Sequence, residues 1–197
     1  LVDLYQKKPI KNKSVCVGLF LGSRKQEIKN HSPVIKKVIV GLQKKINDVF
    51  FVIGSLKKEN EPLAEKLGLK NNYKIVCDSF QAFDESDVAI VASGTATLEC
   101  AITKTPFVVI YKTSFVSWVV TSLFVKVKFA SIVNILAKKL LVREFLQKEC
   151  QAQTITNHLI NLIENNNQSL YNDFEMVVKR LGDGVAYKKT AGFLLLK

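Results

Sequence analysis

VAIVASGTATLECAITKTPFVVIY, residues 88–111, contains two apolar runs separated by a helical stretch. The first run, at 88–93, is rich in β-branched residues and ends at a Ser-Gly-Thr turn, and the second, at 106–111, starts at a proline. Both runs are apolar at consecutive positions, which is typical of strands buried on both faces. The stretch therefore predicts a strand, a helix over 95–105 and a second strand, the repeating unit of a parallel α/β sheet.

Three earlier apolar runs alternate with helical patterns in the same way. The predicted strands lie at 15–21, 48–54, 73–77, 88–93 and 106–111. The predicted helices lie at 23–47, with a start or kink near Pro33, and at 59–69, 79–87 and 95–105. Short connections between strands that are apolar on both faces predict an α/β fold, a Rossmann-like parallel sheet with helices on both faces.

The pattern changes after residue 140, where we expect no further strand. A helix around Trp118 should follow the fifth strand, and residues 141–167, 169–184 and 185–197 predict a helical C-terminal tail. The chain then divides into three parts. These are residues 1–14 as a linker or the remnant of a missing N-terminal domain, 15–150 as the Rossmann-like domain, and 151–197 as C-terminal helices.

The net charge of +12 concerns the partners of the chain and not its fold. Anionic lipid surfaces, nucleic acid and phosphorylated ligands are all compatible with it, and so is a lysine-rich proteome. The basic residues are dispersed and lack the interleaved aromatic residues of a single-strand-binding surface. We therefore expect no nucleic acid partner.

Residues 106–139 are apolar but do not predict a membrane-spanning helix. Three lysines interrupt them: Lys112, Lys126 and Lys128. No run reaches the about 18–20 apolar residues that a spanning helix needs. A strand followed by an amphipathic helix fits better, and its aromatic residues would pack in the core or rest on a membrane surface. These aromatic residues are Phe115, Trp118 and Phe124.

The cysteines and histidines do not indicate a metal site. The four cysteines, at positions 16, 77, 100 and 150, include no CxxC pair. Their spacing favours buried free thiols in a reducing cytosol over disulfides or metal binding. His31 and His158 fall in polar helical patterns, and we expect both at the surface.

The first strand ends in a turn that suits a phosphate group. Ligands of open parallel sheets bind at the carboxyl ends of the strands, where Gly22, Ser23 and Arg24 follow the strand at 15–21. Gly22 permits a tight turn, a helix N-terminus attracts anions, and an arginine beside it adds a bidentate phosphate contact. The alternative for this turn alone is an ordinary connection with a solvent-facing arginine.

The strand at 88–93 ends in a second such turn. Ser93, Gly94 and Thr95 present hydroxyl and N–H groups, and Glu99 follows Thr95 by one helical turn on the same face. A carboxylate there can accept both hydroxyls of a ribose. The alternative is a plain N-cap with an acid in the first turn. Together the two turns indicate a nucleoside diphosphate.

These motifs resemble a known family. SGTATLE after an apolar strand, with LGSR upstream, resembles the donor half of glycosyltransferases of the GT-B fold. The longer order, with YK, SW and an asparagine after SGTATLE and then EFLQ at 144–147, is similar to the lipid-A-disaccharide synthases. The resemblance extends over about residues 15–196, and under it residues 15–150 would bind a UDP-sugar.

The resemblance implies an inverting, metal-independent hexosyltransferase of lipid A biosynthesis. Such an enzyme transfers diacylglucosamine from UDP-2,3-diacylglucosamine to 2,3-diacylglucosamine 1-phosphate, without a further cofactor. It would be a cytoplasmic, peripheral protein at the inner face of the inner membrane of a Gram-negative bacterium, in contact with anionic lipid.

The resemblance also implies roles for individual residues. Arg24 would be the catalytic residue of this chain, because it would neutralise the diphosphate as UDP leaves, and Glu99 would hold the ribose. The other residues implied at the UDP-sugar site are Gly22, Ser23, Ser93, Gly94, Thr95, Ala96, Thr97, Asn134, Glu144 and Gln147.

The sequence departs from the family pattern in the loop that closes on the donor, at Val133, residues 138–140 and Arg143. We also find no counterpart of the acceptor half with its catalytic aspartate, so we expect this chain alone to be inactive or nearly so. The last helix would pack on that half or on a partner, such as a second copy. The alternative is a degenerate, non-catalytic nucleotide-binding or membrane-associated module.

Overall fold

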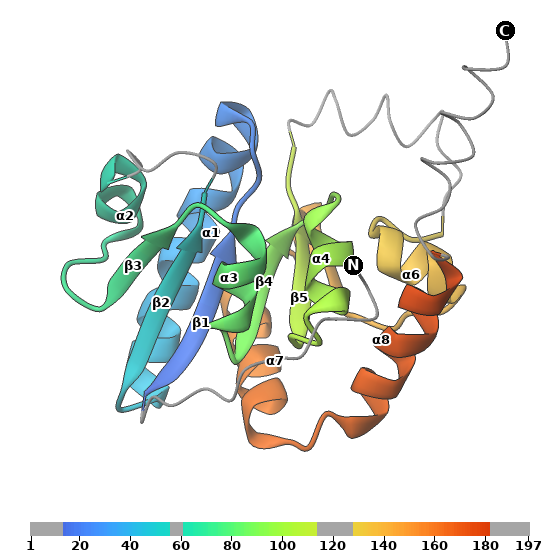
Figure 1. Cartoon of the computed structure of the whole chain (residues 1–197). Helices are drawn as coiled ribbons and strands as arrows, with labels where there is room; N and C mark the ends of the chain where they lie inside the picture. The colour runs from blue at the N-terminus through green and yellow to red at the C-terminus, as the bar shows by residue number, and fades with distance from the viewer. Residues whose placement is uncertain (1–13, 56–60, 114–127, 182–197) are drawn as a thin grey trace, which may run out of the picture.

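A six-stranded, fully parallel sheet forms the centre of the computed structural model, which describes residues 14–55, 61–113 and 128–181 (Figure 1). Its strands lie in the order β3-β2-β1-β4-β5-β6. Their bounds are β1 Val15–Phe20, β2 Val49–Gly54, β3 Tyr73–Val76, β4 Val88–Ala92, β5 Phe107–Tyr111 and β6 Glu144–Leu146. The first five strands confirm the sequence prediction.

The strand order reverses between β1 and β4, which places the ends of these two strands side by side. Leu19 pairs with Ile90 and Phe20 with Val91. On its other side β1 pairs with β2, so the chain has wound outward in both directions from β1. In such a sheet the reversal opens a crevice at the carboxyl ends of the strands.

Helices cover both faces of the sheet, as predicted (Figure 1). On one face lie α1 Lys25–Lys45, α2 Glu61–Leu67 and α7 Ala152–Glu164. On the other lie α3 Ser79–Asp84, α4 Ala96–Ile102, α6 Ile132–Ala137 and α8 Gln168–Arg180. A short 3₁₀ helix, η2 Gln147–Glu149, connects β6 to α7.

Alternate residues of the first five strands contribute to two separate hydrophobic cores. In β4, Val88 and Ile90 pack against α1 and α7, whereas Ala89 and Val91 pack against the helices of the other face. All four side chains are at most 1% exposed. Because both faces are covered, the strand is apolar at every position, and its ends are held rigidly enough to support a binding site.

Strand β6 corrects the prediction that no strand follows residue 140. Glu144, Phe145 and Leu146 pair with Val109, Ile110 and Tyr111 of β5. The segment has only three residues, and two of its neighbours in sequence, Arg143 and Gln147, are polar, so it lacks the long apolar run of the other strands. The Glu144 carboxylate is satisfied by buried N–H groups (described below), which a sequence pattern does not show.

Three smaller predictions were wrong. No helix begins at Pro33, because α1 begins at Lys25 and runs through it to Lys45, whereas the alternative of a kink near Pro33 stays a prediction. His31 is completely buried, although we expected it at the surface, and His158 is partly buried. Cys77 is exposed, whereas Cys16, Cys100 and Cys150 are buried free thiols as predicted.

The helix expected around Trp118 and the last helical segment at 185–197 lie outside the described residues, as do residues 1–13. Within the part of the chain that the structure describes, no helix is both long and apolar enough to cross a bilayer.

Candidate functional site

A cavity of about 410 Å³ opens where the strand order reverses, and we call it the switch-point cavity. Its lining comes from the ends of β1, β2, β3 and β4 and from the turns that follow them. Eight of the residues predicted at the UDP-sugar site line it: Gly22, Ser23, Arg24, Ser93, Gly94, Thr95, Ala96 and Glu99. The fold therefore brings together two turns that are about 70 positions apart in sequence, as predicted.

The turn after β1 is organised by Glu27, a residue that the sequence analysis missed. Its Oε2 accepts hydrogen bonds from the backbone N–H groups of Ser23 (3.1 Å) and Arg24 (3.3 Å). Its Oε1 accepts one from the Arg24 guanidinium at 3.2 Å. Arg24 is the N-cap of α1 and Glu27 is its N3 residue, so the capping-box spacing was the signal that could have revealed it.

His31 connects the end of β1, just before the same turn, to the segment that follows β5. It is 0% exposed, its Nδ1 lies 2.8 Å from the Leu21 carbonyl, and its Nε2 accepts the Lys112 N–H at 3.0 Å. Since Nε2 accepts, Nδ1 carries the proton and the imidazole is neutral. Burial lowers the pKa of His31, and Lys112 lowers it further, against the opposing effects of the Leu21 hydrogen bond and the Glu27 charge.

The turn after β4 uses two of its hydroxyl groups internally. Ser93 Oγ donates to the Ala130 carbonyl and Thr97 Oγ1 to the Gly94 carbonyl, both at 2.7 Å. Thr97 is completely buried and does not line the cavity. The first N–H groups that donate to carbonyls within α4 and its preceding turn are those of Thr97 and Leu98. The N–H groups before them, at the start of the helix, have no partner within it.

Gly94 and Glu99 leave this side of the cavity open. A methyl group on Gly94 would meet no atom of the described residues within 4 Å. The Glu99 carboxylate lines the cavity one helical turn beyond Thr95, and with the described residues it forms no hydrogen bond or ion pair. Its oxygens are thus available to accept hydrogen bonds from a ligand.

Asn134, Glu144 and Gln147 do not line the switch-point cavity. Asn134 is completely buried and makes four bonds of 2.8–2.9 Å: its Nδ2 donates to the Val142 carbonyl and to Glu144, and its Oδ1 accepts the Leu141 and Val142 N–H groups. Gln147 follows β6 with a φ of 45° and is partly buried.

Glu144 connects this buried group to the cavity. The residue is 7% exposed, and its carboxylate accepts hydrogen bonds from the N–H groups of Ala130 and Ser131, both at 2.8 Å, and from the Asn134 amide. The Ala130 carbonyl in turn accepts the Ser93 hydroxyl. Asn134 and Glu144 therefore hold the segment on which the turn after β4 rests.

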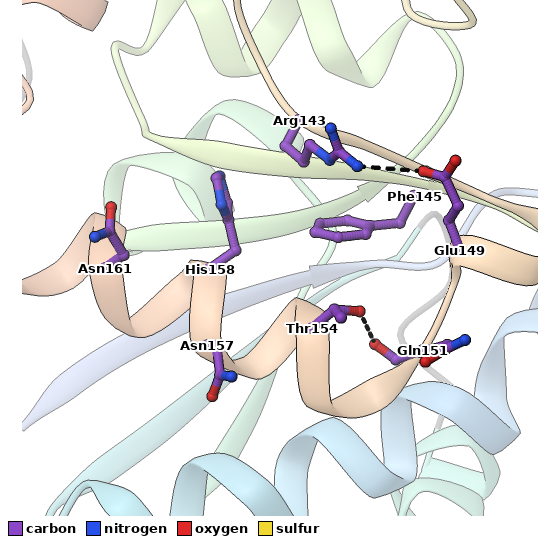
Figure 2. A pocket seen from close by; sticks show the side chains of 8 residues that line it. All are labelled: Arg143, Phe145, Glu149, Gln151, Thr154, Asn157, His158 and Asn161. Atoms are coloured by element: carbon purple, nitrogen blue, oxygen red, sulfur yellow. Dashed lines mark hydrogen bonds and ion pairs between the residues drawn. The ribbon is translucent and has the colours of Figure 1, made fainter.

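A larger hollow, of about 670 Å³, lies between β6, η2 and α7 (Figure 2). Figure 2 shows its two charged side chains, Arg143 and Glu149, paired with each other. Their nitrogen and oxygen atoms lie 3.3 Å apart, and the His158 and Phe145 rings pack edge to face. It lies on the sheet's last strand, away from the strand-order reversal, and its charges are already paired. We therefore assign the ligand to the smaller, switch-point cavity.

Within the described ranges, no three His, Cys, Asp or Glu side chains gather closely enough to hold a metal ion. The chemistry available at the switch-point cavity is then that of the Arg24 guanidinium, the unpaired Glu99 carboxylate and the backbone N–H groups that precede α4. This combination suits a ligand with an anionic diphosphate and a vicinal diol.

The sequence model of a family described as lipid-A-disaccharide synthetase matches residues 3–191. Lipid-A-disaccharide synthase 1 of Legionella pneumophila is 35% identical over 155 residues, which cover 77% of this chain and 40% of that protein. The lipid-A-disaccharide synthase of Persephonella marina is 32% identical over 186 residues, which cover 90% of this chain and 49% of that protein. The chain thus spans less than half the length of these curated relatives.

Solved structures show the same fold at low sequence identity. MnaA of S. aureus, solved with UDP, matches with a TM-score of 0.54 and 16% identity over 90% of this chain and 44% of its own. WaaG, a glycosyltransferase involved in lipopolysaccharide biosynthesis, matches with a TM-score of 0.52 and 12% identity. The match covers 89% of this chain and 44% of WaaG. The sheet and its helices therefore have the fold of one part of each of these solved chains, the Rossmann-like fold of a GT-B half.

Proposed function

Because the chain belongs to the lipid-A-disaccharide synthase family, we propose that its switch-point cavity binds the UDP part of a nucleotide-sugar donor. The observation that carries this proposal is the meeting of Arg24, the Ser93–Thr95 turn and the unpaired Glu99 carboxylate at one cavity. Glu99 accepts hydrogen bonds from the two ribose hydroxyls, while Arg24 and the Gly94 and Thr95 N–H groups donate to the diphosphate.

The proposed reaction is the transfer of 2,3-diacylglucosamine from its UDP derivative to 2,3-diacylglucosamine 1-phosphate. A hydroxyl of the acceptor attacks the anomeric carbon, the bond from that carbon to the diphosphate oxygen breaks, and the configuration inverts. Negative charge develops on the leaving UDP, and a preorganised guanidinium lowers the barrier by stabilising that charge. Arg24 takes this role without a metal ion.

The proton of the attacking hydroxyl needs a base, which we place outside this chain's cavity. The curated relatives are at least twice as long as the matched region, and we propose that their other half supplies the base and the acceptor surface. On this basis the 197-residue chain alone binds UDP but transfers little sugar. The expected contacts with anionic membrane and with a second copy stay predictions.

The competing proposal, a degenerate module, rests on the departures from the family pattern. None of the three places lies at the switch-point cavity. Val133 is buried in α6, Lys138 ends that helix with a φ of 57°, and Arg143 pairs with Glu149. These substitutions are accommodated in the fold, which favours a working donor site.

Calorimetric titration with UDP and with 2′-deoxy-UDP tests the proposal. We expect saturable binding of UDP, weakened about tenfold by Arg24→Ala and by Glu99→Ala. Removing the 2′-hydroxyl should weaken binding to the wild type but not to Glu99→Ala, because that variant no longer holds the ribose. Glu175→Gln, on the surface of α8, is the matched control. Absence of UDP binding by the folded wild type would refute the proposal.

A further inference from the structure

Glu27 lies at the switch-point cavity, yet neither the sequence motifs nor the proposed reaction uses it. Building on the proposed UDP site, we propose that Glu27 is its positioning residue: the carboxylate fixes the turn after β1 and holds the Arg24 guanidinium at the mouth of the cavity. Glu27 then acts on the diphosphate through Arg24 and does not contact it.

The two carboxylate oxygens of Glu27 accept hydrogen bonds from different groups. Oε2 takes both N–H groups of the turn, from Ser23 and Arg24, and so fixes the backbone from which the Arg24 side chain starts. Oε1 takes one N–H of the guanidinium. A guanidinium carries five N–H donors, so the others stay available for a ligand.

Arg24 needs such support because little else restrains it. Its side chain is 82% exposed, against 25% for Glu27. A long exposed side chain loses rotamer freedom when it binds a ligand, and restraint in advance lowers that loss. An isolated exposed ion pair is a weak restraint. Here the partner carboxylate is itself held by two backbone N–H groups, so the restraint extends to the main chain.

Gly22 and Glu27 form one structural unit. Gly22 has a φ of 105°, and a methyl group on its Cα would lie 2.3 Å from Glu27 Oε2 and 2.9 Å from Glu27 Cβ. The glycine therefore provides the space into which the Glu27 side chain folds back. If Gly22 served to let a phosphate approach the backbone, the space beside its Cα would be empty. In this structure the Glu27 carboxylate fills that space.

The opposite role for Glu27, a carboxylate that blocks the anion, is less consistent with the contacts. Both of its oxygens are already engaged by N–H donors, one of them cationic. The open part of the cavity lies on the other side, at Gly94 and Glu99. A nucleotide can enter there and meet Arg24 without displacing Glu27.

A double-mutant cycle on the full chain separates these roles. UDP is titrated into the wild type, Glu27→Ala, Arg24→Ala and the double variant, with Glu175→Gln as the control. We expect Glu27→Ala to weaken UDP about fivefold in the wild-type background and less than about 1.5-fold in the Arg24→Ala background. Glu27→Gln, which keeps an acceptor for the turn but loses the ion pair, should weaken UDP about threefold.

Two further measurements keep the cycle decisive. Circular dichroism establishes that each variant is folded, and Glu27→Gln replaces Glu27→Ala if the latter is not. Amide exchange without ligand should be faster at Ser23 and Arg24 in Glu27→Ala, since both N–H groups lose their acceptor.

The outcomes are distinct. Tighter UDP binding by Glu27→Gln would identify Glu27 as a blocking group and overturn the inference. Equal fold-losses in both backgrounds would show that Glu27 acts independently of Arg24, which also overturns it while leaving the UDP site intact. No UDP binding by the folded wild type would overturn the proposed function and this inference together.

Discussion

Gly22 and Gly94 both line the switch-point cavity, but their surroundings give them different roles. At Gly22, with a φ of 105°, a side chain is strained and its Cβ overlaps Glu27. Gly22→Ala should therefore destabilise the fold by about 1–3 kcal/mol. Gly94→Ala meets open space, so its stability should stay within about 0.5 kcal/mol while UDP binding weakens as the methyl group fills the ligand's space. Urea denaturation and UDP titration of both variants check this contrast.

The result that would contradict it is equal stability loss in both variants, or Gly94→Ala with unchanged UDP affinity. The latter would remove the close approach of a ligand to the turn after β4. Sequence reasoning identified both glycines as turn residues, but it could not distinguish them, because the difference lies in the position of the Glu27 side chain.

His31 predicts a pH dependence of stability. Its pKa is lowered by burial, so the unfolded chain binds a proton more readily than the folded one. Stability is then fully present above the unfolded value of about 6.5 and falls as the pH decreases below it, by at most about 1.4 kcal/mol per pH unit for one histidine. The charged groups that act on His31 are Glu27 and Lys112.

Urea denaturation between pH 5 and 7 measures this effect. The free energy of unfolding of the wild type should decrease toward pH 5, and His31→Gln should decrease less steeply. His158→Gln is the comparison: the pKa of His158 is also lowered, by burial and then by Arg143, so this variant should flatten the pH dependence as well. Equal slopes for the wild type and His31→Gln would contradict the assignment of a neutral His31 between Leu21 and Lys112.

Among the elements, β6 and α6 depend on one buried amide. Asn134 makes four hydrogen bonds, and one of them satisfies the buried Glu144 carboxylate. Asn134→Leu has similar volume but leaves the carboxylate short of a donor and three backbone groups unpaired. We expect a loss of about 3 kcal/mol or more in the free energy of unfolding.

Asn161→Leu, an exposed site on α7, is the control and should change stability by less than about 0.5 kcal/mol. An Asn134 variant as stable as the wild type would mean that the amide does not support Glu144. UDP titration of the folded variant then separates two roles: a loss of affinity would favour the donor contact that the family resemblance implies, and unchanged affinity would indicate support alone.

The elements that the sequence predicted are those whose signal is local. Five strands apolar on both faces alternate with helices, and that pattern determines a parallel sheet covered on both sides. β6 was missed because its stability comes from distant partners: Glu144 is satisfied by residues 130–134, and Phe145 packs on α7. For the same reason the sequence did not predict that Asn134 is a buried amide, or that His31 connects the ends of β1 and β5.

At the scale of the whole molecule, the chain matches less than half the length of its relatives. Yet the described residues that line the switch-point cavity all fall between Phe20 and Glu99. Under the proposed function, binding of UDP needs one sheet only, whereas transfer needs both reactants. This separation of binding from turnover makes ligand-dependent stability the appropriate measurement for this chain.

A ligand that binds only the folded state stabilises it by an amount set by its concentration relative to its dissociation constant. At a hundredfold excess over that constant the stabilisation is about 2.7 kcal/mol, which for a chain of this length raises the melting temperature by about 5–10 °C. Thermal denaturation with UDP should show this increase in the wild type and in Glu175→Gln. Arg24→Ala and Glu99→Ala, at the same UDP concentration, should show about half of this increase, because a tenfold weaker site loses about 1.4 kcal/mol.

Uridine, which has the ribose but no diphosphate, should stabilise the wild type less than UDP does. It should stabilise the wild type and Arg24→Ala to the same extent. An equal response of wild type and Arg24→Ala to UDP would remove the arginine from the diphosphate site.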